Sequence, residues 1–246
     1  MTGPATFGES PLSESVSASA ALGTDVMALC PYPGLDAFTE PFRRYFVGRK
    51  RDTELLVANL YASPLTILYG ASGVGKSSVL LAGVVPRVAD ANDAIVIVHR
   101  TWQSASLITS LGTKLVTAVE AKTGKNSGVD GTRPIDQVVE ELSATWDGPF
   151  LFIFDQFEEY FLYPLEPTSP DSFDAAFARA VNRRSLDVHF MISLREDAIS
   201  GLDRFRHRIP SLLTNLYRLE FLTRDEIRRA ILEPLATLKE LYPNAP

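Results

Sequence analysis

The sequence predicts a three-layer α/β/α sandwich built on a parallel sheet of five strands. From residue 50 onward, short apolar runs rich in β-branched and aromatic residues alternate with longer stretches of helical periodicity. Strands that are apolar along their whole length indicate a sheet covered on both faces, and helices between the strands favour parallel pairing. A glycine-rich loop stands between the first strand and the helical stretch after it.

The five strands are expected, in chain order, at residues 65–69, 94–99, 150–154, 188–193 and 217–221. Helices are expected at 51–61, from the glycine-rich loop to residue 88, at 104–122, 134–146, 171–184 and 195–207, and from residue 223 onward. The last helix carries Asp225 and Glu226 in its first turn, where carboxylates are favourable. Strands and helices interleaved in this way are typical of a doubly wound sheet.

Size and composition limit the class of protein. The 246 residues suffice for one α/β domain with tails but are short for two. A net charge of −6 provides no general attraction to nucleic acid or to an anionic membrane. The single cysteine, Cys30, fits a reducing compartment, and no apolar run approaches the 18 residues of a membrane span. We expect a cytoplasmic protein that has no membrane partner and for which nucleic acid is an unlikely partner.

Composition also divides the chain into three parts. Residues 1–29 are rich in Ser, Ala, Gly and Pro and show no apolar period, so we expect a disordered tail. Residues 30–240 carry the strands and helices of the domain. Residues 241–246 are expected to begin a linker or a truncated lid.

The glycine-rich loop, Gly70-Ala-Ser-Gly-Val-Gly-Lys-Ser77, matches the Walker A pattern G-x-x-x-x-G-K-[ST]. Its glycines let successive N–H groups converge on phosphates at a helix N-terminus. Lys76 can reach the β- and γ-phosphates, and the Ser77 hydroxyl can ligate Mg²⁺. The motif predicts that the chain binds ATP or ADP with Mg²⁺; the alternative is a glycine turn with a solvated lysine. The residues expected to hold the nucleotide are Gly70, Ala71, Ser72, Gly73, Val74, Gly75, Lys76, Ser77 and Ser78.

A Walker B strand is expected at 150–154, because an apolar run ends there on Asp155 at the edge of the sheet where ligands bind. Asp155 would hold Mg²⁺ through water. Gln156 stands where many ATPases have a glutamate. Glu158, or else Glu159, would then orient the attacking water. The alternative is that one of them caps the next helix while the other is solvated.

Arginines near two later strands are further candidates. Arg195 follows the strand at 188–193 and could sense the γ-phosphate, or it could pair with Glu196 or Asp197. The cluster Arg204, Arg206 and Arg208 could supply an arginine finger to a neighbouring subunit or form a solvated helix face. His99 and His189 alternate with apolar residues and are expected to be core or edge histidines.

These motifs together resemble the STAND class of signal-transduction ATPases, and more narrowly the novel STAND type 1 group of the AAA/ASCE lineage. The resemblance covers about residues 30–240. Its carriers are Cys30-Pro-Tyr-Pro-Gly-Leu, Tyr45-Phe-Val-Gly-Arg49, Gly70 to Ser78 with Leu81-Ala-Gly-Val-Val-Pro86, Phe154-Asp-Gln-Phe-Glu-Glu-Tyr-Phe161, Ser193-Leu-Arg-Glu-Asp197 and Arg229-Ala-Ile-Leu-Glu-Pro234.

The resemblance implies the strand order 2-3-4-1-5, which places the strand of Arg195 between the two Walker strands. It implies that backbone groups of Val47 and Gly48 read the adenine. It also implies an ATP-gated switch with slow hydrolysis, used in bacterial signalling or defence, that self-associates or carries sensor and effector domains. In the family plan a helical lid and a winged helix follow the last helix, whereas this sequence stops at Pro246. We therefore expect either a fragment or a protein whose other parts lie on another polypeptide.

Three other functions stay open on the residues alone. A small P-loop kinase would need an arginine-rich lid, which the run from Ser78 to Asp93 does not show. A nucleic-acid-associated ATPase is favoured by eleven arginines between Arg179 and Arg229, although seven acidic residues share that span. A protein that binds nucleotide without turnover is compatible with Gln156.

Overall fold

The computed structural model describes residues 30–91, 93–102, 107–162 and 169–243. The tail expected at 1–29 and the last three residues of the expected linker, 244–246, lie outside the described residues. Within the described part of the chain, no helix combines the length and the apolar character that crossing a membrane requires.

The centre of the molecule is a parallel sheet of five strands in the order β2-β3-β4-β1-β5. The strands are β1 (Leu65–Gly70), β2 (Ile95–His99), β3 (Phe150–Phe154), β4 (Val188–Arg195) and β5 (Leu216–Arg218). In register, Gly70 of β1 lies opposite Arg195 of β4, so the glycine-rich loop and Arg195 leave the sheet at the same edge. The observed order confirms the predicted fold class and topology.

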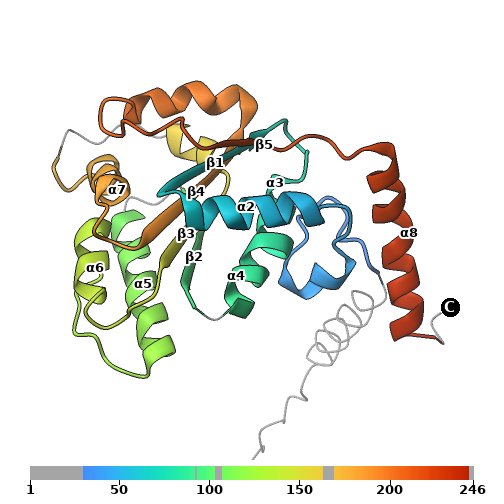
Figure 1. Ribbon diagram of the computed structural model, residues 1–246, viewed down its shortest axis with the longest axis horizontal. Coiled ribbons are helices and arrows are strands. Elements are labelled where there is room, and N and C mark those ends of the chain that lie inside the picture. Colours follow the sequence, from blue (N-terminus) through green and yellow to red (C-terminus); the bar gives the residue numbers. More distant parts are fainter. Residues whose placement is uncertain (1–29, 92, 103–106, 163–168, 244–246) are drawn as a thin grey trace, which may run out of the picture.

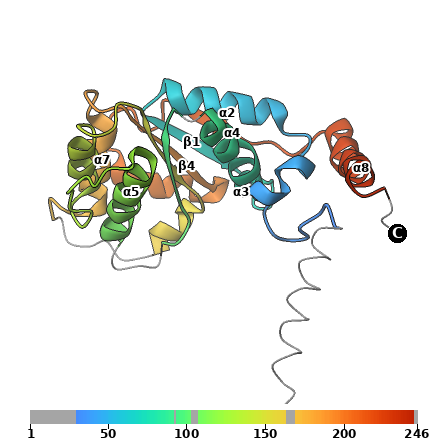
Figure 2. The same ribbon diagram turned by 90° about the horizontal axis from the view of Figure 1, so that it is seen from below.

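Helices cover both faces of the sheet, as the continuous apolar strands predict. On one face, α2 (Lys50–Ala62) and α4 (Val85–Ala91) pack on residues such as Leu68, Leu151 and Met191. On the other face lie α5 (Leu107–Thr123), α6 (Ile135–Leu142) and α7 (Phe173–Asn182) (Figures 1 and 2).

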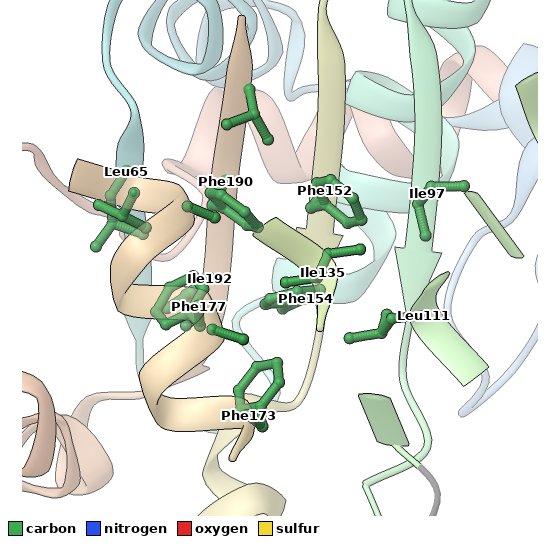
Figure 3. Close-up of a cluster of buried hydrophobic side chains, with 14 of the residues drawn as sticks. Leu65, Ile97, Leu111, Ile135, Phe152, Phe154, Phe173, Phe177, Phe190 and Ile192 are labelled. Carbon is green, nitrogen blue, oxygen red and sulfur yellow. The ribbon is translucent and has the colours of Figure 1, made fainter. Parts of the chain in front are cut away.

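The second face is filled by aromatic rings. Phe152 and Phe154 of β3 and Phe190 of β4 are fully buried, and Phe173 and Phe177 of α7 cover them (Figure 3). Phe152 stacks on Phe190 with their centroids 5.0 Å apart, and Phe177 meets Phe190 edge to face. Such contacts add about 0.5–1.5 kcal/mol per pair beyond burial. They hold β3 and β4, whose ends carry the predicted site residues, in a fixed relation.

Several helices differ from the prediction. The helix after the glycine-rich loop consists of α3 (Lys76–Ser78), a π-helical turn (η2, Val79–Val84) and α4, with Gly83 of the π turn pressed against Thr53. The expected helix 134–146 ends at Leu142, after which the Ser143 hydroxyl bonds back to the Val139 carbonyl. These differences arise from tertiary and local side-chain contacts rather than from propensity.

Further differences affect the C-terminal half. The helix expected at 195–207 is a 3₁₀ segment, η4 (Glu196–Phe205), in which Gly201 weakens the α conformation and packs against the ring of Phe161. β5 covers three residues instead of five. Two short 3₁₀ helices, η1 (Glu40–Tyr45) and η3 (Phe157–Leu162), were not expected.

The last helix, α8 (Arg224–Leu241), lies outside the sandwich and packs beside η1 (Figures 1 and 2). It begins on a capping box, in which the Thr223 and Glu226 side chains bond reciprocally to each other's backbone N–H. Five apolar side chains of α8 are exposed by 40–53%, namely Ile227, Ile231, Leu232, Leu235 and Leu241.

Candidate functional site

A cavity of about 610 Å³ opens at the edge of the sheet where β1, β3 and β4 end. Its walls combine three parts of the chain: the 34–38 segment, the phosphate loop, and residues that directly follow β2, β3 and β4 or end them. The wall residues outside the 34–38 segment are Ser72, Gly73, Gly75, Lys76, Ser77, Ser78, Arg100, Asp155, Gln156, Glu158, Ser193 and Arg195. This is the edge at which open α/β sheets bind ligands.

The glycines of the phosphate loop serve two different purposes. Gly73 and Gly75 have φ angles of 73° and 98°, in the left-handed region that favours glycine, and they turn the loop around the cavity. Gly70 has an ordinary φ, but a Cβ there would lie 2.6 Å from the carbonyl oxygen of Leu219. Gly70 is therefore required by the close approach of the chain after β5, a reason that the motif alone does not reveal.

Lys76 folds over its own loop. Its Nζ donates to the carbonyls of Gly70 and Ala71, each at 2.9 Å. Burial lowers the pKa of Lys76, while Glu158 and Asp155 raise it through their negative charges. The ammonium group thus stands between the loop and two carboxylates, where a bound phosphate would be a stronger acceptor than the carbonyls.

Asp155 is held from both sides through its backbone. Its N–H donates to the His99 carbonyl at 2.9 Å, and its own carbonyl accepts from Trp102 Nε1 at 2.8 Å. The side chain is 1% exposed, and its Oδ2 lies 3.2 Å from Nε of Arg100. The angle of this ion pair is too poor for a hydrogen bond, and within the described residues Oδ2 has no hydrogen-bond partner. A buried carboxylate oxygen of this kind is a suitable ligand for Mg²⁺ or its bound water, together with the Ser77 hydroxyl on the same cavity.

The chain turns sharply after Asp155. Gln156 adopts a φ of 55°, the left-handed conformation that non-glycine residues rarely take. The turn starts η3 and places Glu158 on the cavity wall, with its Oε2 buried and without a hydrogen-bond partner in the described part of the protein. Glu159 does not belong to the cavity wall. The geometry therefore favours Glu158 over Glu159 as the residue beside the phosphates.

Ser193 and Arg195 bring β4 to the same cavity. Arg195 lies on the wall and also forms the alternative ion pair, donating from Nε and Nη2 to Asp197 at 3.0 and 2.6 Å. Ser193 is fully buried, and its Oγ has no hydrogen-bond partner among the residues described. The sequence indicated no role for Ser193, although it opens the run from Ser193 to Asp197, and none for Arg100, which lies in none of the motifs.

The cluster of arginines before β5 does not reach this cavity. Arg204 donates twice to Asp174 and stacks over the ring of Tyr160, with only 15% of its side chain exposed. Arg206 pairs with Asp203 on the surface. An arginine finger from Arg204 would require breaking a partly buried ion pair, so the internal structural role is the better interpretation of Arg204.

A second, mostly apolar cavity of about 420 Å³ adjoins the first and shares Phe38, Gly73, Gly75 and Ser78 with it. It lies between Phe46 and Val47 on one side and α8 on the other, with Ile227, Ala230 and Ile231 on the wall. An aromatic and aliphatic cavity beside the phosphate loop suits a nucleobase.

Of the two residues expected at the base, Val47 lies on this wall and Gly48 does not. Gly48 has a φ of 93° and packs against the carbonyl of Glu226 at the start of α8. The next residue, Arg49, is 7% exposed and donates to the carbonyls of Val74 and Glu220, each at 2.8 Å. Arg49 thus ties the phosphate loop to the segment that leads into α8.

The 30–38 segment contributes wall residues to both cavities. At one end the Tyr32 hydroxyl donates to the carbonyl of Ile231 in α8, and at the other the N–H of Phe38 donates to Oγ of Ser78 at 3.1 Å. Ser78, predicted as a nucleotide-binding residue, therefore also anchors this segment to the helix of the phosphate loop.

Comparisons with known proteins agree with this geometry. The sequence model of the family described as novel STAND NTPase 1 matches residues 31–241. No curated protein sequence matches. Among solved structures, the Walker-type ATPase of Pyrococcus abyssi is similar, with a TM-score of 0.56, 20% identity, and coverage of 86% of this chain and 63% of its own.

The ORC2 protein of Aeropyrum pernix, solved as ADPNP–ADP complexes, is also similar, with a TM-score of 0.54 and 16% identity over 77% of this chain and 52% of its own. This chain thus spans about half to two thirds of the length of these neighbours, and at such identities the likeness shows the shared P-loop ATPase fold. The family match covers most of the sequence, from the 30–38 segment to the end of α8. The chain therefore belongs to the novel STAND NTPase 1 family of P-loop NTPases.

Proposed function

We propose that this chain binds ATP and ADP with Mg²⁺ in the two adjoining cavities and acts as a nucleotide-gated switch with slow hydrolysis. The observation that carries the proposal is a group of three buried polar atoms, on the cavity wall that includes Lys76, that have no hydrogen-bond partner among the described residues. They are Oδ2 of Asp155, Oε2 of Glu158 and Oγ of Ser193, and all three residues line the cavity beside the phosphate loop. Buried polar atoms are rarely left unpaired, so this arrangement fits a polar ligand.

Each residue has a distinct part in this proposal. When bound, Mg²⁺ would neutralise negative charge on the phosphates. The loop N–H groups and Lys76 hold the phosphates, while Ser77 and Asp155 hold the ion. Glu158 accepts a hydrogen bond from the attacking water and orients it, and Arg195 contacts the γ-phosphate after leaving Asp197. The base occupies the apolar cavity beside Val47.

Slow ATP hydrolysis is expected because the arginines before β5 do not supply an arginine finger to this cavity. Phosphoryl transfer depends on positioning and on positive charge at the γ-phosphate, and an arginine finger adds about 10³- to 10⁵-fold in rate. In the described residues of this chain, Arg204 is engaged by Asp174 and lies away from the cavity. An arginine finger in addition to the two arginines on the cavity wall, Arg100 and Arg195, would come from a second copy or from an attached domain, which makes fast hydrolysis depend on assembly.

The switch itself would run through α8. The base cavity has α8 as one wall, and the 30–38 segment joins α8 to the helix of the phosphate loop. A bound nucleotide therefore contacts elements on both sides of this connection. We infer that α8, coupled in this way to the nucleotide, controls self-association or contact with sensor and effector domains. Bacterial signalling or defence is the role that we infer for this control.

Calorimetry of ATP binding tests the proposal. The Lys76→Ala variant should lose nucleotide binding, because it lacks the cation of the phosphate loop, whereas Lys125→Ala on an exposed turn should bind like the wild type. Asp155→Ala should lose affinity in Mg²⁺ much more than in EDTA. Undiminished ATP affinity of Lys76→Ala would refute the assignment, and an equal loss with and without Mg²⁺ would make Asp155 a structural residue.

A further inference from the structure

Arg100 lines the cavity but lies outside the sequence motifs. It directly follows β2, and the pairing of His99 with Phe154 brings the ends of β2 and β3 together. The bond from the Asp155 N–H to the His99 carbonyl extends this pairing by one residue. The fold therefore sets Arg100 beside Asp155 at the carboxyl edge of the sheet.

The contact between these two side chains is electrostatic and easily exchanged. Nε of Arg100 lies 3.2 Å from Oδ2 of Asp155, but this oxygen receives no hydrogen bond within the described part of the chain. Asp155 is 1% exposed, so it needs a positive partner, because a buried carboxylate without one is strongly unfavourable. Arg100 is 40% exposed and projects into the cavity, so it can leave this position at a smaller cost in burial.

Arg195, the other arginine of the cavity wall, differs from Arg100 in its ion-pair partner. Arg195 is held by two well-directed hydrogen bonds to Asp197, a residue outside the cavity wall. Arg100 instead takes its charge partner from the carboxylate proposed to hold the metal. Mg²⁺, or a water bound to it, would compete with the guanidinium group for this buried oxygen.

We propose that Arg100 is a resident counter-ion of Asp155 which Mg²⁺ replaces, and that the released guanidinium group then binds the γ-phosphate of ATP. The inference rests on the proposed binding of Mg²⁺ and nucleotide. In this exchange the positive charge beside Asp155 is conserved, while the phosphates gain a planar donor suited to their oxygens. Arg100, together with Arg195, then lets the cavity distinguish a triphosphate from a diphosphate.

The exchange predicts two changes in Arg100→Met, which keeps an apolar stem and removes the charge. The Mg²⁺ concentration at half-maximal binding of a ribose-labelled fluorescent ADP should fall about threefold, because Mg²⁺ no longer displaces an ion pair. The preference for ATP over ADP, measured by competition in saturating Mg²⁺, should fall about tenfold with the lost charged hydrogen bond. Arg100→Lys should lie between wild type and Arg100→Met, and Arg184→Met on the exposed surface should match the wild type.

The possible results separate the two proposals. Failure of the wild type to bind labelled ADP would overturn the proposed function itself. Binding by the wild type with an unchanged or raised Mg²⁺ midpoint in Arg100→Met would overturn the exchange at Asp155. An unchanged ATP-to-ADP ratio would overturn the phosphate contact. Should Arg100→Met fail to fold, as judged by circular dichroism, Arg100→Lys must shift both quantities in the same directions, and wild-type values there would contradict the inference.

Discussion

Arg49 joins three segments that are distant in sequence, and its replacement by methionine should destabilise the protein strongly. Its guanidinium group is 7% exposed and donates to the carbonyls of Val74 and Glu220 and to the carboxylate of Asp52. Methionine keeps a stem of similar length but provides none of these donors. The change therefore isolates the hydrogen bonds from the packing of the side chain.

The magnitude follows from the bonds that are lost. A hydrogen bond from a charged donor contributes about 1.5–3 kcal/mol, and two carbonyls lose such a donor. Asp52 keeps a partner, because the Tyr217 hydroxyl donates to its Oδ1 at 2.6 Å. We therefore expect Arg49→Met to lower the free energy of unfolding by about 3–5 kcal/mol. For a domain of this size that corresponds to a loss of about 6–20 °C in Tm.

Urea denaturation followed by circular dichroism measures this change. The m-value should stay the same, since the surface exposed on unfolding is unchanged, and the midpoint should fall. Arg51→Met, an exposed position on the same helix, is the control and should stay within about 0.5 kcal/mol of the wild type. A loss below about 1 kcal/mol in Arg49→Met would refute the assigned role of these bonds.

Three further predictions concern the loop, a buried histidine and the residue proposed to orient the water. Gly70→Ala places a Cβ 2.6 Å from a backbone oxygen, so urea denaturation should show a loss of about 1–3 kcal/mol, and wild-type stability would contradict the close approach. Burial, with the nearby positive charge of Lys114, lowers the pKa of His99 to about 4, so the unfolded chain takes up its proton first as the pH falls. Stability should therefore drop by up to about 3 kcal/mol between pH 6.5 and 4, and His99→Gln but not His207→Gln should remove that part of the pH dependence. In a phosphate-release assay Glu158→Gln should slow turnover while ATP affinity stays, with Glu159→Gln unchanged; the opposite pattern would move the role to the neighbouring residue.

The sequence predicts the elements that are governed by local pattern. Continuous apolar strands and a full phosphate-loop motif identify the three layers and the position of Lys76, because both depend on residues close together in the chain. The strand order came from the family resemblance, since pairing between distant strands leaves no mark in spacing.

Features that depend on contacts between distant segments could not be predicted. The pairing of Arg100 with Asp155 requires that β2 lie beside β3, and the anchoring of Tyr32 on α8 joins residues 199 positions apart. Gly70 belongs to the motif, but the reason why this position requires glycine, the close approach of the Leu219 backbone, is visible only in the fold. The close approach of Phe161 to Gly201, within the 3₁₀ segment at 196–205, likewise joins residues far apart in the sequence.

Hydrogen exchange with and without ATP and Mg²⁺ tests most directly whether these cavities hold the nucleotide. Exchange reports local opening segment by segment, so it locates the ligand in solution. We predict that nucleotide slows exchange in the peptides covering residues 70–78 and 154–158. Exchange in the peptide of α5, on the face of the sheet shared with α6 and α7, should stay unchanged. Protection elsewhere with no change at residues 70–78 would contradict the account.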